Sequence, residues 1–414
     1  MLELPASKIL IVDGVEDDPL MRARAERLRT GIPTGEVRHV SDEELCAIVK
    51  QERSRPAHNG MRAEFDPIVI FNRYRFDDDD EERRRRTEAY PELDWTDKLK
   101  LNGYGGFDWR DSGSAAYRKR TGLVCQPAYA LHTIVGCHFR CAYCSLSRII
   151  SIMLNVEDYV SRLDKWLERC PNQTLFQNDN YTDNVCFEPE YGAARLLIEY
   201  FARKPGKALE LYVGKSDRVD CLLDDDHRGH TVCCWSLSAQ TQSTAFEWRS
   251  APMAARIEAM RKCQEAGYPV RVRLSPILPV KDWRDENREM IERLFRHVTP
   301  DVITMETIRF LNYDRMCELF DLSLLDEAFL EVMKARPDPP EYQGCELPDA
   351  YRESVYDFVI SQIERVSPQT RFAFCREKRS MWTRFADRLA RHGQDPDHYV
   401  CNCGPRSAPV TAVG

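Results

Sequence analysis

Three cysteines stand close together in the stretch GCHFRCAYCSLS, residues 136–147, at positions 137, 141 and 144. Thiols at this spacing can belong to an apolar core, a redox pair, a zinc site or an iron–sulfur site. A structural zinc ion takes four protein ligands, and local zinc motifs usually supply cysteines in two pairs. Three cysteines leave one coordination position open, which suits a [4Fe–4S] cluster whose fourth iron binds a ligand from outside the protein. We therefore favour an iron–sulfur cluster at Cys137, Cys141 and Cys144.

A second cysteine set stands near the end of the chain, where Cys375, Cys401 and Cys403 form a C-x25-C-x-C pattern. Three unrelated buried thiols are one interpretation of this pattern. Zinc is another, with a fourth ligand from Cys345, His392 or His398. We favour an auxiliary [4Fe–4S] cluster with three protein thiolates and an open iron, because such an iron could hold a substrate or give up sulfur to it.

Composition limits the classes of protein that can carry these sites. The 414 residues have a formal net charge of −8, so the chain has no broad basic excess for binding a phosphate backbone, and we expect nucleic acid to be an unlikely partner. The first residues lack the pattern of a signal peptide, and no apolar run is long enough to cross a membrane. Sixteen cysteines in such a chain are expected to stay reduced or to bind metal, which predicts a cytoplasmic protein.

The first 75 residues predict a small α/β unit. Strands are expected at 8–14, 36–40 and 67–72, with helices at 19–32 and 41–52 between them. The charge blocks DDDDEERRRR at 77–86 are typical of a solvated linker, because the acidic half cancels the field of the basic half.

From residue 129 the chain alternates between strand and helix patterns. Strands are expected at 129–136, 173–179, 208–216, 230–238, 269–278 and 301–310, with helical segments between them. Six such β/α repeats predict a partial parallel barrel, a (β/α)6 fold, in which chemistry gathers at the carboxyl ends of strands. We expect domains at 1–115 (α/β unit and linker), 116–315 (barrel) and 316–414 (a mostly helical or irregular extension with the second cysteine set).

The motif CHFRCAYC resembles that of the radical S-adenosylmethionine (radical SAM) superfamily, including the aromatic residue before the last cysteine. Within it, the segments KILIVDG, NVEDYV, VGKSDRVDCLLDDDHRGHT, WSLSAQ and APMAARIEAMRKCQEAGYPV are similar to spore photoproduct lyase, which repairs a thymine dimer in DNA. The resemblance runs from Lys8 to Phe310. It implies that SAM binds the open iron and is cleaved by one electron to methionine and a 5′-deoxyadenosyl radical.

The resemblance also implies contacts to SAM at strand ends. Tyr143 would pack near the adenine, and Thr182 and Lys215 would contact polar groups of the methionine or ribose. Lys215 has the clearest physical reason, because a cation stabilises a neighbouring carboxylate. Ser236 would bond the methionine end, or it is an ordinary strand-end hydroxyl. Arg271 and Arg273 share one strand face and would attract an anionic group, with Arg273 assigned to the cofactor, unless they form salt bridges.

The sequence departs from the lyase where that enzyme has a hydrogen-donating cysteine, because the matching position is Asn180. Asp179, Asn180 and Asp183 offer acceptors and an amide for a hydroxyl-rich or amine-bearing substrate, or they form an Asx-rich turn. Cys186 lies nearby in sequence but six residues out of register.

These observations favour a radical SAM enzyme that modifies a small molecule. The substrate suggested is a nucleoside or nucleotide sugar that receives sulfur from the auxiliary cluster, as in antibiotic biosynthesis. An external electron donor such as flavodoxin or ferredoxin would be required, and no membrane partner is expected. The alternatives are DNA-lesion repair of the spore photoproduct lyase type and a non-catalytic iron–sulfur or zinc-binding regulatory protein.

Overall fold

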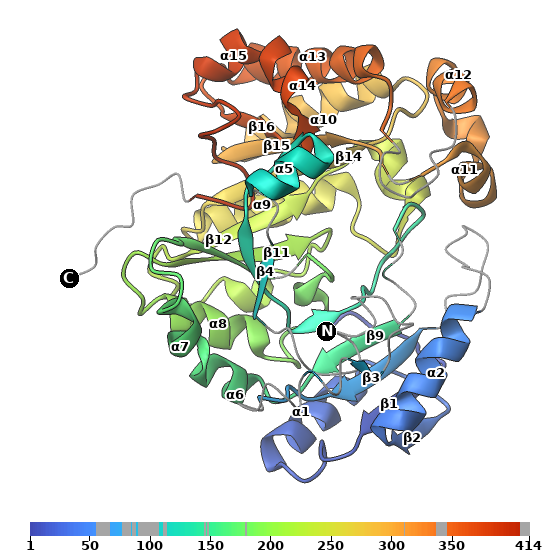
Figure 1. Ribbon diagram of the computed structural model, residues 1–414, viewed down its shortest axis with the longest axis vertical. Helices are drawn as coiled ribbons and strands as arrows, with labels where there is room; N and C mark the ends of the chain where they lie inside the picture. Colours follow the sequence, from blue (N-terminus) through green and yellow to red (C-terminus); the bar gives the residue numbers. More distant parts are fainter. Residues whose placement is uncertain are drawn as a thin grey trace.

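The fold is that of a computed structural model, which describes residues 1–54, 67–76, 84, 88–89, 107–110, 114–144, 146, 149–178, 180–309, 311–336 and 346–405. Two sheets organise these residues, and short helical segments connect their strands. In Figure 1 the N-terminal sheet lies at the bottom, the larger sheet crosses the centre and the C-terminal helices cover the top. No helix in the described part of the chain is both long and apolar enough to cross a membrane.

The N-terminal sheet has the strand order β2-β1-β3-β9-β7. Its first three strands are those expected from the sequence, and they pair in parallel around β1 because helical crossovers join them. The elements of this layer are β1 Lys8–Val12, α1 Pro19–Arg29, β2 Val37–Val40, α2 Asp42–Ser54, β3 Ile68–Asn72, β7 Ile134–Val135 and β9 Ile149–Met153.

The strand β9 was missed by the sequence analysis. Its residues, IISIM, are fully buried and pair in parallel with β3, so this piece of the barrel region completes the N-terminal sheet. The single strand expected at 129–136 is also wrong in detail. It divides into β6, which joins the large sheet, and β7, which turns into the N-terminal sheet antiparallel to β9. The cysteine loop therefore starts from the N-terminal sheet, next to the large one.

The large sheet has the order β16-β15-β14-β12-β11-β10-β6-β4, in which only β4 is antiparallel. The expected partial barrel is confirmed, with seven parallel strands rather than six. The additional strand, β16, comes from the C-terminal extension and pairs with β15. Its strands are β4 Phe107–Arg110, β6 Ala128–Leu131, β10 Leu175–Asn178, β11 Ala208–Gly214, β12 Thr231–Ser236, β14 Val270–Ile277, β15 Val302–Thr307 and β16 Phe372–Phe374.

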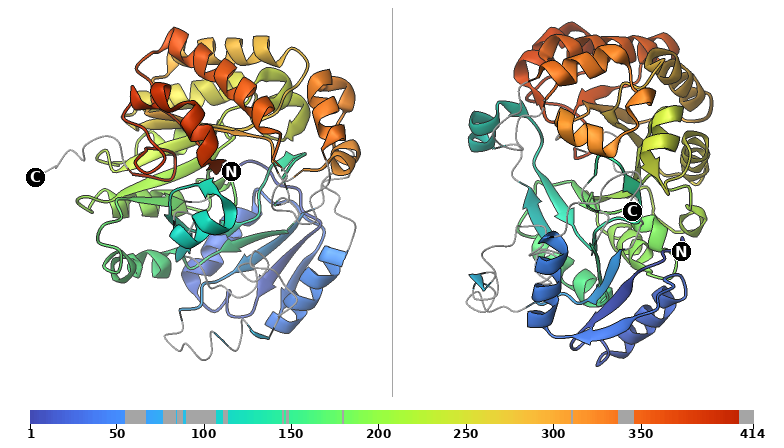
Figure 2. Two further views of the ribbon diagram at one scale, coloured as in Figure 1. Left: turned by 45° about the horizontal axis from the view of Figure 1, so that its top comes forward. Right: turned by 90° about the vertical axis from the view of Figure 1, so that its right-hand side faces the viewer.

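Helices cover the outer face of this sheet. They are amphipathic because their apolar residues recur at helical spacing; in α8, for example, Ala194, Leu197, Ile198 and Phe201 are buried. The helix α10 packs against both α9 and α13, and Figure 2 shows the C-terminal helices gathered on one side of the molecule. The helices outside the N-terminal layer are α5 Ala115–Thr121, α6 Val156–Ser161, α7 Leu163–Leu167, α8 Ala193–Phe201, α9 Met253–Glu265, α10 Trp283–His297, α11 Tyr313–Leu319, α12 Glu327–Ala335, α13 Asp349–Val366, α14 Arg379–Arg384 and α15 Ala386–Ala390.

Side chains point alternately to the two faces of the large sheet, and those on the inner face of the barrel include polar residues. Paired residues of neighbouring strands point to the same side, and the registers Gln177↔Glu210, Tyr212↔Cys234 and Arg273↔Thr304 align polar side chains across the sheet. Polar residues at buried positions require partners inside the barrel. Two short antiparallel pairs close the structure around this face: β8 Arg140–Cys141 with β13 Glu247–Trp248, and β5 Leu123–Val124 with β17 Glu377–Lys378.

Candidate functional site

The cysteine loop begins at a position that only glycine can fill. Gly136 has φ of +112°, and a Cβ there would lie 2.2 Å from the carbonyl oxygen of Ile149 in β9. The loop then closes on itself, because the Cys144 N–H donates to the Cys141 carbonyl at 2.9 Å. Cys141 is part of β8, so the loop is also fixed to β13.

The three thiols are within electrostatic reach of one another. Burial raises the pKa of Cys137 well above its ordinary value, and Asp183, Cys144 and Cys141 raise it further. Burial likewise raises the pKa of Cys141 to about 12. Within the described residues, no three His, Cys, Asp or Glu side chains already surround a metal position. Binding a cluster here would therefore require the thiols to turn toward one another and to release protons.

A buried carboxylate next to this loop carries a permanent charge. Burial alone would raise the pKa of Glu247, but Lys215 and Arg256 outweigh it and lower the pKa to about 2. Arg256 donates to Glu247 at 2.6 Å, and the Lys215 ammonium lies 4.0 Å from the other carboxylate oxygen. Two cations therefore face one anion, and this group of three keeps one positive charge in a region shielded from water. Such a site favours an anionic group of a ligand.

Neutral donors hold Glu247 in place. The Ser238 hydroxyl donates at 2.6 Å, the Gln242 amide at 3.2 Å, and the Tyr143 hydroxyl donates to the same oxygen. Tyr143 also has the Lys215 ammonium over its ring, 5.8 Å from the centroid. The predicted residues Tyr143 and Lys215 are thus brought together with Cys141, whereas Glu247, Gln242 and Arg256 were not identified from the sequence.

Two further predicted residues lie beside this group with unused polar atoms. Thr182 Oγ1 and Asp183 Oδ1 are buried and have no hydrogen-bond partner among the described residues. The other Asp183 oxygen accepts from the Lys215 N–H at 2.7 Å, and burial raises the pKa of Asp183 to about 7. Gly214 makes this approach possible, since a Cβ there would lie 2.5 Å from Asp183 Oδ2. Asn180 is part of a half-exposed bend, and Asp179 lies outside the described residues.

These features fit SAM at a cluster of three thiolates. The loop supplies the sulfur ligands, the surplus positive charge suits the carboxylate of SAM, and the unpartnered oxygens can accept from its amino or hydroxyl groups. Cys186 is fully buried. Burial raises the pKa of its thiol well above the ordinary value, and Asp183 and Cys137 raise it further. It is therefore part of the packing behind the loop.

The predicted residues Ser236 and Arg273 lie deeper in the barrel. The Ser236 hydroxyl bonds the Tyr212 hydroxyl at 2.7 Å, and the Arg273 guanidinium lies over the Tyr212 ring, 5.4 Å from its centroid. Arg273 thus lies on the side of Tyr212 that faces the second cysteine set. Arg271, expected to share its role, binds the chain itself: it donates to Asp301 at 2.9 Å and to the Cys401 carbonyl at 2.6 Å.

The second cysteine set is brought together inside the barrel, and it includes a thiol that the sequence did not indicate. Cys375, Cys401 and Cys403 each interact electrostatically with Cys125. The proposed alternative ligands are elsewhere: His398 is 88% exposed, His392 packs against Phe372, and Cys345 lies outside the described residues. Cys125 was missed because 250 residues separate it from Cys375, and no local motif marks it.

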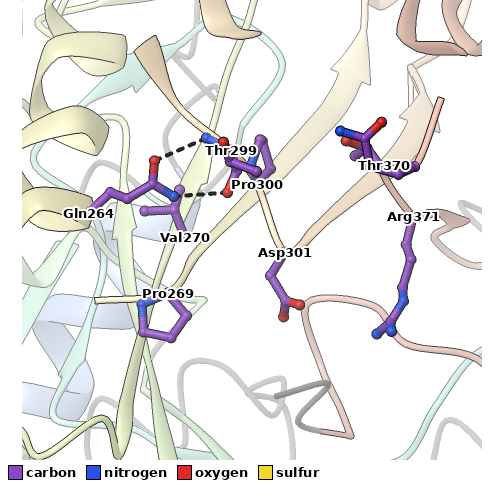
Figure 3. A pocket seen from close by; sticks show the side chains of 9 residues that line it. Gln264, Pro269, Val270, Thr299, Pro300, Asp301, Thr370 and Arg371 are labelled. Atoms are coloured by element: carbon purple, nitrogen blue, oxygen red, sulfur yellow. Dashed lines mark hydrogen bonds between the residues drawn. The ribbon is translucent and has the colours of Figure 1, made fainter. Parts of the chain in front are cut away.

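A shallow pocket at the other end of the barrel is separate from these sites. It has a volume of about 380 Å³ and lies at the amino ends of β14 and β15. Figure 3 shows the Gln264 amide bonded to both backbone groups of Thr299, at 2.9 and 3.0 Å, so this part of the pocket wall is already hydrogen-bonded. Its position opposite the strand ends makes it an unsuitable place for the predicted chemistry.

Comparison with known proteins finds relatives of the central part of the chain. Residues 124–316 match the family described as spore photoproduct lyase. Spore photoproduct lyase of Bacillus subtilis is 32% identical over 191 residues, which are 44% of this chain and 56% of the relative. That of Clostridium acetobutylicum is 26% identical over 179 residues, 41% and 53% of the two chains. The chain thus matches about half the length of these curated relatives.

Solved structures extend the likeness in fold to most of the chain. A spore photoproduct lyase complexed with dinucleoside spore photoproduct has a TM-score of 0.62 and 19% identity, over 89% of this chain and 98% of that one. A double mutant of the lyase with bound AdoMet and dinucleoside spore photoproduct also has a TM-score of 0.62, at 18% identity and the same coverage. The chain therefore has the spore photoproduct lyase fold.

Proposed function

Because residues 124–316 match the spore photoproduct lyase family, we propose that the chain is a radical SAM enzyme of the spore photoproduct lyase type. A [4Fe–4S] cluster at Cys137, Cys141 and Cys144 would supply the electron that cleaves SAM to methionine and a 5′-deoxyadenosyl radical. The observation that carries the proposal is the meeting of this loop with the Lys215–Glu247–Arg256 group at the barrel strands.

The residues of the chain have distinct parts in this reaction. Lys215 and Arg256 keep a positive charge for the SAM carboxylate, and Glu247 holds both cations in place. Thr182 and Asp183 accept hydrogen bonds from the ligand. Burial of the group excludes water, which strengthens each of these interactions and protects a radical from side reactions.

The test is anaerobic reconstitution with iron and sulfide, followed by incubation with SAM and dithionite. We expect 5′-deoxyadenosine from the wild-type chain and from Cys170→Ser, a buried cysteine in a different part of the barrel. We expect none from Cys141→Ala. If the reconstituted wild-type chain holds iron but forms no 5′-deoxyadenosine, the enzyme proposal fails.

We infer that the substrate contains a nucleoside, since the neighbour with the same fold binds a dinucleoside. The same likeness weakens the expectation that nucleic acid is an unlikely partner. That expectation rested on the negative net charge of the chain, which does not prevent a single lesion from binding inside the barrel. Reversal of a spore photoproduct-type lesion is therefore the leading reaction. Incubation with dinucleoside spore photoproduct should release two thymidine units, whereas a product of different mass would point to another nucleoside reaction.

The second cysteine set favours a second candidate function. A cluster at Cys375, Cys401 and Cys403 with an open iron could transfer sulfur to a nucleoside sugar, which would suit natural-product biosynthesis and a chain with Asn180 in place of a hydrogen-donating thiol. Such an enzyme would give a product carrying one sulfur atom per turnover, detected by ³⁴S labelling of the reconstituted cluster. Either candidate needs an external electron donor of the flavodoxin or ferredoxin class, and a reducing compartment such as the cytoplasm would keep the cysteines free to bind metal.

A further inference from the structure

The last described residues of the chain are anchored against the inner face of the barrel. The Asn402 N–H donates to Thr304 Oγ1 in β15 at 3.2 Å, and Arg271 of β14 donates to the Cys401 carbonyl at 2.6 Å. Cys401 and Gly404 also form a backbone bridge with each other. This segment therefore has a fixed place, and Cys401 and Cys403 are held inside the barrel.

Cys125 is held beside this segment by its neighbour in sequence. The Gln126 amide donates to the Gly404 carbonyl at 2.8 Å and to the Cys401 sulfur at 3.5 Å. The same stretch pairs with the residues that follow Cys375, because β5 and β17 are antiparallel with Glu377 opposite Val124. Three separate parts of the chain thus bring four cysteines to one place.

Buried charges around these thiols suit an anionic occupant. The Arg110 guanidinium donates to the Cys403 sulfur at 3.0 Å, and Arg273 lies on the same side. The Nε atoms of Arg110 and Arg273 and both oxygens of Glu210 are buried without partners among the described residues. A metal–thiolate centre carries net negative charge and accepts hydrogen bonds at sulfur, so it would pair with the two guanidinium groups and not with the Glu210 carboxyl.

The orientation of one thiol suits a cluster, whose ligand sulfurs lie farther apart than those around a single zinc ion. Zinc with four thiolates has Zn–S distances of about 2.3 Å, which requires all four sulfurs to be in mutual contact. The Cys401 sulfur accepts from the Cys403 N–H at 3.4 Å, and the Cys125 thiol donates to the Gln126 carbonyl at 3.6 Å and not to another thiol. As at the first site, no three of these side chains surround a metal position yet.

We propose that Cys125, Cys375, Cys401 and Cys403 together bind the second [4Fe–4S] cluster, with Cys125 as its fourth ligand. This inference rests on the second cluster of the proposed function and makes it more specific. A cluster with four protein thiolates has no open iron on which to bind a substrate. The second site then serves electron transfer or structure, and the fourth ligand argues for the lyase-type reaction over sulfur transfer through an open iron.

The test isolates the second site by removing the first. A chain with Cys137→Ala, Cys141→Ala and Cys144→Ala, reconstituted anaerobically, should keep about four irons and four sulfides, and show the EPR signal of a reduced [4Fe–4S] cluster. Absence of iron, or zinc in its place, would overturn the proposal. The first site is tested independently by 5′-deoxyadenosine formation in the chain with these three cysteines intact.

The fourth ligand is tested by adding Cys125→Ser to this background. We expect loss of half or more of the remaining iron, or a changed EPR signal in what remains, because serine is a poor ligand for this cluster. The matched control is Cys170→Ser, whose thiol is 8% exposed like that of Cys125 and also donates to a backbone carbonyl. Circular dichroism confirms that both variants are folded. An unchanged iron content and an unchanged EPR signal in the Cys125→Ser variant would show that Cys125 is not the fourth ligand and that the cluster has an open iron.

Discussion

Replacing Glu247 by glutamine should destabilise the folded barrel. The pKa of this buried carboxyl falls from 4.5 to about 2, so its surroundings favour the charged form by about 3 kcal/mol, at about 1.4 kcal/mol for each pKa unit. A glutamine amide loses this charge and brings an N–H toward Arg256 and Lys215, which are themselves donors. We expect the free energy of unfolding at pH 7 to fall by about 3 kcal/mol.

The pH dependence fixes the sign of this effect. The folded pKa is lower than the ordinary value, so the stabilisation is complete above pH 4.5 and is lost as the pH falls toward 2. The difference between wild type and Glu247→Gln should therefore be constant from pH 6 to 8 and smaller by about 1 kcal/mol at pH 4.

Urea unfolding followed by circular dichroism measures this difference at each pH. The control is Glu258→Gln, an exposed carboxylate paired with Arg261 on α9, for which we expect little change. If Glu247→Gln is as stable as the wild type at pH 7, Glu247 is not the charged centre of this site, and the surplus positive charge assigned to it is wrong.

Three further predictions concern the same loop and its surroundings. Asp183→Asn should raise the free energy of unfolding at pH 8 by about 4 kcal/mol and change little at pH 3, because burial raises the pKa of Asp183 from 3.8 to about 7; urea unfolding that shows no gain at pH 8 would contradict this. Lys215→Met should weaken SAM binding about 10- to 100-fold in anaerobic calorimetry, because a charge-assisted contact is lost. The control is Lys207→Met, which should leave SAM binding unchanged, because the Lys207 ammonium binds backbone carbonyls outside the site. Cys141→Ala should keep the circular dichroism of the wild type, since the barrel core does not depend on this thiol, and normal SAM cleavage by this variant would show that the loop is not the site.

The sequence predicted the elements with strong patterns. The alternating strands and helices between residues 173 and 310 were found because parallel strands are buried on both faces and amphipathic helices repeat their apolar residues. The predictions from the sequence are wrong for short strands whose pairing partner is distant in the sequence. The residues of β9 pair with β3, about 80 positions earlier, and β16 pairs with a strand nearly 70 positions before it, so neither partner is visible locally.

The sequence by itself was enough to group the three thiols of the first loop. Cys137, Cys141 and Cys144 are close along the chain, so a short loop brings them together whichever fold surrounds it. Only the tertiary structure decided what surrounds them. Glu247 lies beside Cys141 because β13 pairs with the cysteine loop, and Cys125 reaches Cys403 because residues 401–405 lie inside the barrel. The cost of burying a charge is set by the partners that the fold supplies, and Lys215, one of the partners of Glu247, comes from the end of another strand, β11.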